Sequence, residues 1–281
     1  MRERTFGRTG VSVPVVGQGT WNMEHDDVRS CVAAIRRGLD LGMTHVDTAE
    51  LYGSGTVEEI VAEAIDGRRE GVFLVSKVVP ENASRRGTLR HCEESLRRLR
   101  TDHLDCYLLH WPGRHPIEGT VTAFRELVRD GKIRAWGVSN FDESELDELL
   151  EIADADEVAC NQVLYHLEER AIEHAVVPFC EAQGIALVGY SPFGSGRFPT
   201  PQSEGGRALA IIAEDRGVTA RQVALAFLTR HACTFAIPKA SRVAHVEENA
   251  GAGDLVLTDG EVARLDEAFP RGPRRRGVPT L

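Results

Sequence analysis

Eight short apolar segments recur along this chain, and each is followed by a segment with helical periodicity. The apolar residues run continuously and do not alternate with polar ones, which is typical of strands covered on both faces of a sheet. The predicted strands are residues 15–21, 45–47, 72–78, 105–110, 133–138, 158–164, 186–190 and 234–237. Eight strand–helix units in about 250 residues favour an α/β fold of the (β/α)8 TIM barrel type. We therefore expect a single domain over residues 1–281.

Two regions are predicted outside this strict alternation. Residues 5–6 and 11–13, joined by Gly7-Arg8-Thr9-Gly10, predict an N-terminal β-hairpin. The segment after the seventh strand holds two helical patterns, and a further helix begins near Thr258 at the C-terminal end. The predicted helices are residues 28–41, 57–65, 84–99 (with Ser84 as N-cap), 120–128, 143–152, 172–183, 207–216, 220–230 and 243–250.

A doubly wound sheet is the alternative architecture. It would have fewer strands and a dinucleotide-binding glycine motif directly after the first strand. The first predicted strand ends instead in Gly17-Gln18-Gly19-Thr20-Trp21, whose glycine spacing differs from that motif. The barrel is therefore favoured.

Composition and charge narrow the possible partners. The chain is 42% hydrophobic and 27% charged, which is ordinary for a globular protein. A net charge of −10 argues against a nucleic-acid partner, and the basic tail with Arg271, Arg274, Arg275 and Arg276 is interpreted as solvated. No apolar run approaches the roughly 20 residues of a membrane span, and residues 1–6 lack a signal-peptide core. We expect a cytoplasmic protein with no membrane partner.

The cysteines are scattered, without CxxC pairs or metal-ligand spacing. They are Cys31, Cys92, Cys106, Cys160, Cys180 and Cys233. The sequence thus predicts no disulfide and no metal site, as suits a reducing compartment. No long apolar face indicates a dimer interface, so we expect a monomer.

Polar, aromatic or closely approachable groups stand at the end of every predicted strand. They are Gly19-Thr20-Trp21, Asp47, Lys77, His110, Ser139-Asn140, Gln162, Tyr190-Ser191 and Lys239. Active sites of TIM barrels lie at the carboxyl ends of the strands. One such residue would be an ordinary strand cap, but a complete set indicates a functional site.

Four of the residues near this rim suit proton transfer: Asp47, Tyr52, Lys77 and His110. An ammonium beside a phenol favours phenolate, so we expect the pKa of Tyr52 to lie below its usual value of about 10. Asp47 is expected to keep Lys77 charged and in place. The combination predicts a general acid that is usable near neutral pH.

Other chemistries are less favoured by the same residues. His110 has no His or Cys at ligand spacing, which argues against a metal. Ser139 and Ser191 lack a nucleophile elbow, which argues against a Ser–His–Asp triad.

Several short motifs occur in a fixed order from the hairpin to the last strand. They are Gly7-Arg8-Thr9-Gly10, Gly17-Gln18-Gly19-Thr20-Trp21, Asp47-Thr48-Ala49-Glu50-Leu51-Tyr52-Gly53, Val75-Ser76-Lys77, Leu108-Leu109-His110-Trp111-Pro112, Gly131-Lys132-Ile133-Arg134, Gly137-Val138-Ser139-Asn140-Phe141, Asn161-Gln162, Gly189-Tyr190-Ser191-Pro192 and Ile237-Pro238-Lys239-Ala240-Ser241. In this order they resemble the aldo-keto reductase family along nearly the whole chain. The resemblance implies an NADPH-dependent reduction of an aldehyde or ketone to an alcohol, with the reverse oxidation possible.

The resemblance also implies roles for the four residues. Tyr52 would protonate the carbonyl oxygen while the nicotinamide delivers a hydride to the carbon. Lys77 and Asp47 would tune Tyr52, and His110 would hydrogen-bond and orient the carbonyl. These donors act where negative charge develops in the transition state.

A larger set of residues is implied for the cofactor. Tyr190 would stack on the nicotinamide, and the glycine-containing loop 191–196 would lie along the pyrophosphate. Lys239 and its neighbours would hold the adenosine 2′-phosphate. The implied set is Gly19, Thr20, Trp21, Asp47, Ser139, Asn140, Gln162, Tyr190, Ser191, Pro192, Phe193, Gly194, Ser195, Gly196, Ile237, Pro238, Lys239, Ala240, Ser241, Arg242, His245, Glu248 and Asn249.

One position departs from the family pattern. Many members have an Arg six residues after the Lys of the last motif, where this chain has His245. Arg clamps phosphate with two hydrogen bonds, whereas His is mostly neutral at pH 7. Arg242 is a candidate replacement. We hypothesise a preference for NADPH over NADH that rests chiefly on Lys239.

The substrate pocket is expected beside Tyr52 and His110, with Trp21, Met23 and Trp111 as apolar walls. The segment after the last helix, residues 271–281, is short, which predicts an open pocket. Small α-ketoaldehydes such as methylglyoxal, or aromatic aldehydes, are the expected carbonyl substrates.

Two other functions remain open. One is an NADPH-binding sensor or regulatory subunit with slow turnover. The other is a different barrel enzyme in which Lys77 forms a Schiff base.

Overall fold

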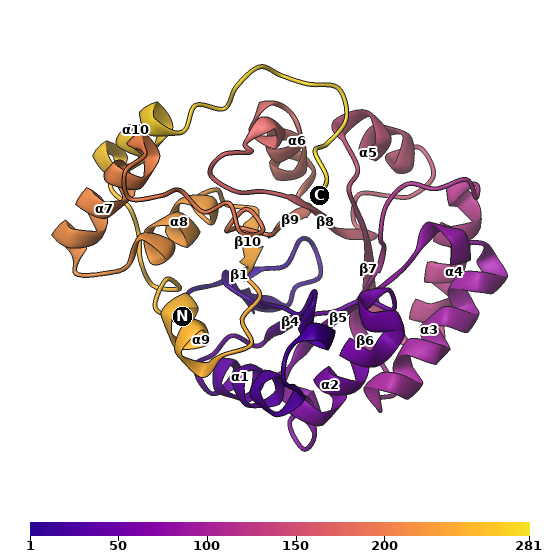
Figure 1. The fold of residues 1–281 in the computed structure, drawn as a ribbon. Helices are drawn as coiled ribbons and strands as arrows, with labels where there is room; N and C mark the ends of the chain where they lie inside the picture. Colours follow the sequence, from indigo (N-terminus) through magenta and orange to yellow (C-terminus); the bar gives the residue numbers. More distant parts are fainter.

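A computed structural model describes residues 1–281, and its centre is one sheet of eight parallel strands. The strands follow one another in sequence order around the sheet, so each pairs with its neighbour in the chain. They are β3 (Gln18–Gly19), β4 (His45–Asp47), β5 (Phe73–Val78), β6 (Leu104–Leu109), β7 (Ile133–Ser139), β8 (Val158–Leu164), β9 (Ala186–Tyr190) and β10 (Thr234–Ile237). Figure 1 shows helices around the strands, which confirms the predicted (β/α)8 barrel.

The first and last strands close the barrel through a few backbone contacts, which we call the seam. Isolated bridges join Val16 to Ala236 and Gly19 to Lys239. Gly17 N donates to Ala236 O at 2.8 Å. Close approach at the seam requires glycine, since a Cβ on Gly19 would lie 2.5 Å from the carbonyl oxygen of Ile237. Strand β3 covers only Gln18–Gly19, much less than the predicted segment 15–21, because Val16 pairs only through an isolated bridge.

Ten α-helices surround the barrel, and several begin with a side-chain cap. Ser84 accepts from Gly87 N, as predicted, and Asp142 and Thr258 form capping boxes. Two helices after β9 and one at the C-terminal end confirm the expected additions. The helices are α1 (Val28–Asp40), α2 (Thr56–Ile65), α3 (Arg85–Leu99), α4 (Ile117–Arg129), α5 (Glu143–Leu150), α6 (Val176–Gln183), α7 (Glu204–Arg216), α8 (Ala220–Leu228), α9 (Val243–Ala250) and α10 (Asp259–Ala268).

The N-terminal hairpin plugs the amino-terminal end of the barrel. Strands β1 (Glu3–Thr5) and β2 (Ser12–Pro14) pair antiparallel, which confirms the predicted hairpin. Just after β1, Phe6 is fully buried, with its ring 4.7 Å from that of Phe73 and 5.3 Å from that of Phe235. The plug leaves the carboxyl end of the barrel as the accessible end.

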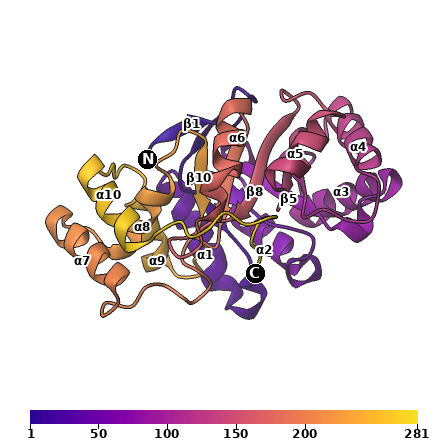
Figure 2. The same ribbon diagram turned by 90° about the horizontal axis from the view of Figure 1, so that it is seen from above.

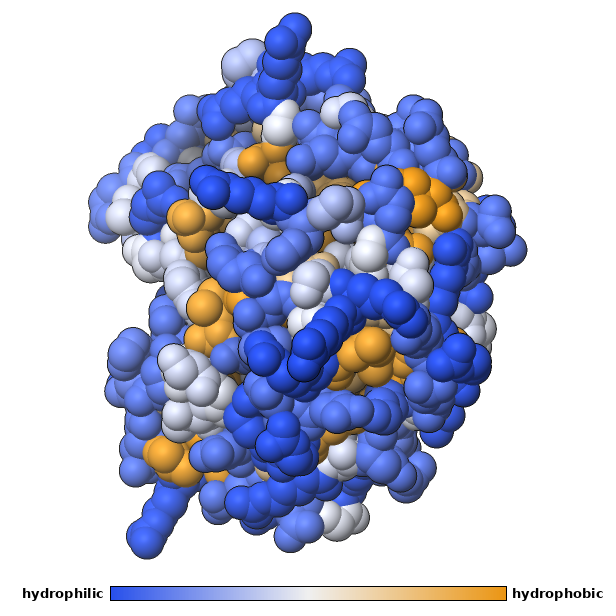
Figure 3. Space-filling view, turned by 90° about the vertical axis from the view of Figure 1, so that its right-hand side faces the viewer, coloured by the Kyte–Doolittle hydropathy of each residue, from blue (hydrophilic) through white to orange (hydrophobic).

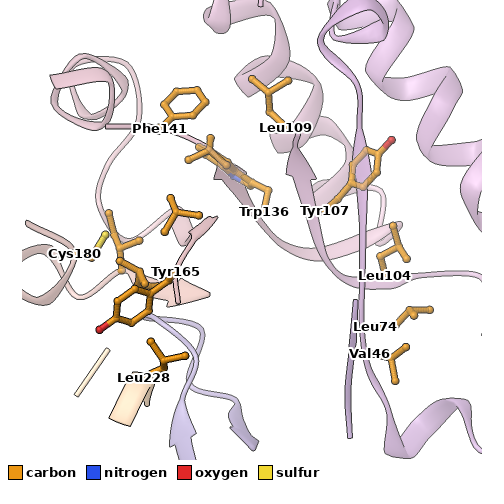
Figure 4. Close-up of a cluster of buried hydrophobic side chains, with 14 of the residues drawn as sticks. Val46, Leu74, Leu104, Tyr107, Leu109, Trp136, Phe141, Tyr165, Cys180 and Leu228 are labelled. Atoms are coloured by element: carbon orange, nitrogen blue, oxygen red, sulfur yellow. The ribbon is translucent and has the colours of Figure 1, made fainter. Parts of the chain in front are cut away.

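The main apolar core lies between the strands and the surrounding helices. Outward side chains such as Leu109 and Trp136 belong to this layer, part of which is drawn in Figure 4. Phe124 of α4 stacks on Trp136 at 5.3 Å between ring centroids. None of the helices combines the length and apolarity that crossing a membrane requires. On the face shown in Figure 3, hydrophilic residues dominate and apolar ones form separate patches. The expected monomer stays a prediction.

Candidate active site

A buried chain of hydrogen bonds links three of the predicted catalytic residues. Asp47 ends β4, and Lys77 lies beside it on β5. Lys77 Nζ donates to Asp47 Oδ1 at 2.6 Å, to the carbonyl oxygen of Thr48 at 2.8 Å and to the hydroxyl of Tyr52 at 3.2 Å. Burial disfavours the ammonium, but the charges and hydrogen bonds of Asp47 and Tyr52 outweigh it and raise the pKa of Lys77. Lys77 is therefore charged at neutral pH, and all three N–H bonds of its ammonium donate hydrogen bonds.

Tyr52 begins a short 3-10 turn, Tyr52–Gly55, which separates β4 from α2. Gly53 and Ser54 have left-handed backbone angles there, with φ of 55° and 53°. A Cβ on Gly53 would lie 2.8 Å from Cβ of Glu24, so glycine fits this turn on both counts. The turn places the Tyr52 hydroxyl against Lys77.

The expected direction of the Tyr52 pKa shift is corrected by this geometry. Burial raises the pKa of Tyr52 above 10, and the opposing effect of Lys77 does not reverse it. Asp47 contributes in the same direction as burial, because its negative charge also disfavours phenolate. Tyr52 consequently keeps its proton at neutral pH and has it available to donate.

His110 follows β6 and faces Tyr52. Its backbone N donates to Val78 O at 2.9 Å, and its ring lies edge-on to the Tyr52 ring with centroids 5.8 Å apart. Burial, together with the charge of Lys77, holds the pKa of His110 well below its usual value. A neutral imidazole carries one N–H, so His110 can donate one hydrogen bond to a carbonyl oxygen.

Polar side chains from the neighbouring strands support these groups. Gln162 Nε2 donates to Asp47 Oδ2 at 2.7 Å, so the carboxylate is held from both sides. The hydroxyl of Tyr190 donates to Asn140 Oδ1 at 2.9 Å, and Asn140 Nδ2 donates to the carbonyl oxygen of His110 at 3.1 Å. Strands β7, β8 and β9 thereby fix the positions of groups on β4 and after β6.

A cavity of about 720 Å³ opens above this network. Trp21 and Trp111 line it as predicted, but Met23 does not, because it is 1% exposed and packs in the apolar core. The sequence also missed several lining residues, which are Leu51, Pro112, Glu145, Gly277, Val278, Thr280 and Leu281. Leu51 and Pro112 adjoin Tyr52 and Trp111 in the chain, so proximity in the sequence could have indicated them.

The C-terminal segment forms part of the cavity wall, and the expected open pocket stays a prediction. Figures 1 and 2 show it crossing from α10 toward β8. Arg274 pairs with Glu143 at 2.6 Å, and Arg275 pairs with Glu169 at 3.2 Å. Although short, this tail brings Gly277, Val278, Thr280 and Leu281 to the cavity. The side chains of Arg274 and Arg275 stay 63% and 60% exposed, which agrees with the interpretation of a solvated basic tail.

A second cavity of about 670 Å³ shares one lining residue with the first. That residue is Lys239. Arg221 of α8, which the sequence analysis did not single out, also lines the second cavity. Its guanidinium lies 5.8 Å from the ring centroid of Phe193 and 5.1 Å from that of Phe198.

The residues expected to bind the cofactor fall into three groups, according to which cavity they line. The first cavity is lined by Gly19, Thr20, Trp21, Asp47, Ser139, Asn140, Gln162, Tyr190, Ser191, Ile237 and Lys239. The second is lined by Phe193, Gly196, Lys239, His245, Glu248 and Asn249. Pro192, Gly194, Ser195, Pro238, Ala240, Ser241 and Arg242 line neither cavity. No group of three or more His, Cys, Asp or Glu side chains is arranged to hold a metal ion.

Comparison with known proteins decides the family. A model of the aldo/keto reductase family matches residues 15–269. The chain is 46% identical over 263 residues to methylglyoxal reductase YeaE of Escherichia coli, with 92% of each protein covered. The chain belongs to the aldo/keto reductase family. The resemblance noted in the sequence is thus confirmed.

Other relatives of this aldo/keto reductase agree with that assignment. Glyoxal reductase of Bacillus subtilis is 34% identical, with 92% of this chain and 89% of the relative covered. A solved aldo/keto reductase of Klebsiella pneumoniae, in complex with NADP and acetate, is 42% identical. The structural match covers 100% of both chains, with a TM-score of 0.94. The expectation of an NADP-linked aldo-keto reductase is confirmed at the level of the family.

Proposed function

We propose that this chain reduces small aldehydes, and α-ketoaldehydes in particular, with NADPH as the reductant and Tyr52 as the proton donor. The observation that carries the proposal is the buried chain of hydrogen bonds from Asp47 through Lys77 to Tyr52. Tyr52 lines the cavity at the end of that chain, beside a neutral His110. A retained proton and a fixed cation therefore lie where a carbonyl oxygen would enter.

The cofactor expected for the family fits the two adjoining cavities. NADPH would supply a hydride to the carbonyl carbon. Tyr190, which is held by Asn140, presents a half-buried aromatic ring at the first cavity. Gln162 has its nitrogen committed to Asp47, which leaves its carbonyl oxygen to accept from a carboxamide. Lys239 lies at the junction, where it can bind the 2′-phosphate.

The proton and the developing charge are handled by residues of the chain. Tyr52 donates its hydroxyl proton to the carbonyl oxygen as negative charge builds on it. The phenolate left behind is stabilised by Lys77, whose own charge is maintained by Asp47. His110 orients the substrate by donating a hydrogen bond to the same oxygen. These donors are fixed in advance, so little reorganisation accompanies the reaction.

The cavity walls support a small carbonyl substrate. Trp21, Trp111 and the tail residue Val278 surround the space above Tyr52. The names of two relatives, methylglyoxal reductase and glyoxal reductase, point to the same substrate class. These compounds carry two adjacent carbonyls, so the α-ketoaldehydes methylglyoxal and phenylglyoxal and the dialdehyde glyoxal are the first compounds to assay.

Tyr52→Phe tests the proposed proton donor, because it removes only the hydroxyl. We expect kcat to fall by about 100- to 10,000-fold, the range that a general acid supplies. The Kd of NADPH should change less than about twofold, as the hydroxyl acts on the substrate. The measurement is NADPH absorbance with an α-ketoaldehyde panel, alongside a binding titration.

Three outcomes would contradict the proposal in different ways. Equal rates in the parent and in Tyr52→Phe would mean that another group is the acid. NADPH binding without turnover of any aldehyde would favour the sensor alternative. Borohydride trapping of a substrate on Lys77 would favour Schiff-base chemistry.

A further inference from the structure

The carboxylate of Asp26 faces the residues expected to hold the 2′-phosphate of NADPH. Lys239 Nζ donates directly to Asp26 Oδ2. Hydrogen bonding to Lys239 lowers the pKa of Asp26, despite burial, and the hydroxyl of Ser241 and the charge of Arg242 act in the same direction. One carboxylate thus pairs with the cation that is attributed to phosphate binding.

Asp26 is held firmly in this position. It ends the 3-10 turn η1 (Met23–His25), and its backbone N donates to Met23 O at 3.1 Å. The side chain of Met23 is buried in the core, which anchors that turn. On the other side, Asp27 caps α1 by accepting from Ser30 N at 2.8 Å. Because the turn before Asp26 and the helix cap after it are both held in place, the backbone of Asp26 keeps its carboxylate beside Lys239.

Lys239 is equally restricted, because its backbone belongs to the seam beside Gly19. Its side chain is 32% exposed, and that of Asp26 is 35% exposed, so a ligand can reach the pair. Lys239 has three N–H donors, and the carboxylate takes one of them. A phosphate needs the same charge and the same donors to bind tightly.

We propose that Asp26 is a cofactor-specificity residue, an internal anion that competes with the adenosine 2′-phosphate for Lys239. The assignment rests on the proposed function, which places the 2′-phosphate of NADPH at Lys239. NADH has no 2′-phosphate and leaves the ion pair intact, so Asp26 penalises only NADPH. Asp26 thereby reduces the difference in affinity between NADPH and NADH that Lys239 creates.

Asp26→Asn tests this competition, because it removes the charge and keeps the shape. The probes are NADP+, NAD+ and 2′,5′-ADP, which carries the 2′-phosphate without a nicotinamide, with binding measured by calorimetry. An exposed ion pair changes a binding constant by up to about fivefold, and removing the repulsion between carboxylate and phosphate adds to this change. We therefore expect NADP+ and 2′,5′-ADP to bind roughly three- to tenfold more tightly. The Kd of NAD+ should stay within about twofold.

Two comparisons make the result specific. Glu247→Gln removes one negative charge from the nearby helix α9, where Glu247 pairs with Arg37 at 2.8 Å, and should leave all three affinities within about twofold. The tightening caused by Asp26→Asn should also shrink in a Lys239→Met background, because only the relief of repulsion remains without that ammonium. Melting temperatures of all variants verify that each is folded.

The opposite results overturn the assignment. Weaker binding of NADP+ by Asp26→Asn would mean that the carboxylate positions Lys239 for the phosphate. Equal tightening for NADP+ and NAD+ would mean a general charge effect on both cofactors. Unchanged NADP+ affinity in Asp26→Asn refutes the competition alone, whereas a parent protein that binds neither NADP+ nor 2′,5′-ADP refutes the proposed function as well.

Discussion

At the scale of single residues, burial and charge decide protonation in this barrel. His45 shows this away from the catalytic groups, since it starts β4 inside the barrel with neither ring nitrogen hydrogen-bonded. Burial lowers the pKa of His45 from 6.5 to about 4. The unfolded chain takes up this proton below about pH 6.5, whereas the folded protein does not. Acid therefore favours unfolding between pH 6.5 and 4.

His45→Leu should remove this contribution to acid sensitivity. For one such histidine, the free energy of unfolding falls by about 2 kcal/mol between pH 8 and pH 5. The parent protein should lose about that much more stability than the variant over this interval. Urea unfolding at the two pH values measures it, with the mostly exposed His25→Leu as the control. The same loss in parent and His45→Leu would show that His45 is protonated in the folded state.

At the scale of elements, the strand ends hold Asp47 and Lys77, and the C-terminal tail completes the wall of the cavity. Arg274 and Arg275 fix the tail through Glu143 and Glu169, and the following residues line the cavity. The tail thus belongs to the cavity wall, although it is far from Tyr52 and His110 in the sequence. Its contribution should be to substrate affinity.

Removing residues 277–281 should raise KM for phenylglyoxal roughly five- to twentyfold, because about 1–2 kcal/mol of apolar contact is lost. The kcat should change less than about threefold, since Tyr52, Lys77 and His110 keep their positions. Steady-state kinetics separate the two constants. Leu281→Ser should give a smaller rise in KM. A fall in kcat with unchanged KM would mean that the tail acts on the chemical step.

The sequence was informative about those features that short motifs and strand order determine. The barrel could be predicted from the alternation of strands and helices, and the hairpin from its turn. The grouping of Asp47, Lys77 and His110 could be predicted from their positions at strand ends. The burial of Met23, the raised pKa of Tyr52 and the approach of Asp26 to Lys239 depend on packing between distant segments, which no local pattern encodes. The path of the tail to the cavity could not be predicted, because the sequence shows the length of the tail and not its course.

At the scale of the whole molecule, the seam links cofactor binding to the integrity of the barrel. Gly19 and Lys239 bridge the first and last strands, and both line the first cavity. A ligand that binds only the folded state at a hundred times its Kd adds about 2.7 kcal/mol of stability. Residues near the ligand should gain the most protection from local opening.

NADP+ should therefore slow hydrogen exchange most at the seam. The amides of Gly17 and Gly19 donate to Ala236 O and Pro238 O at 2.8 and 3.2 Å, and are the reporters. Leu108, in the middle of the sheet on β6, is the control. Exchange measured by NMR with and without NADP+ would contradict the prediction if the seam amides and Leu108 gained equal protection.

Closure of the barrel and pairing of Asp26 with Lys239 belong to the same event. The contact between Asp26 and Lys239 joins residues 213 positions apart, so it carries a large loop-closure entropy. Contacts of such high sequence separation form late and slowly in folding. A chain with seven strands already paired would hold Tyr52 and His110 near one another and still lack this ion pair. Formation of the ion pair is consequently a kinetic marker for the joining of the two ends of the sheet.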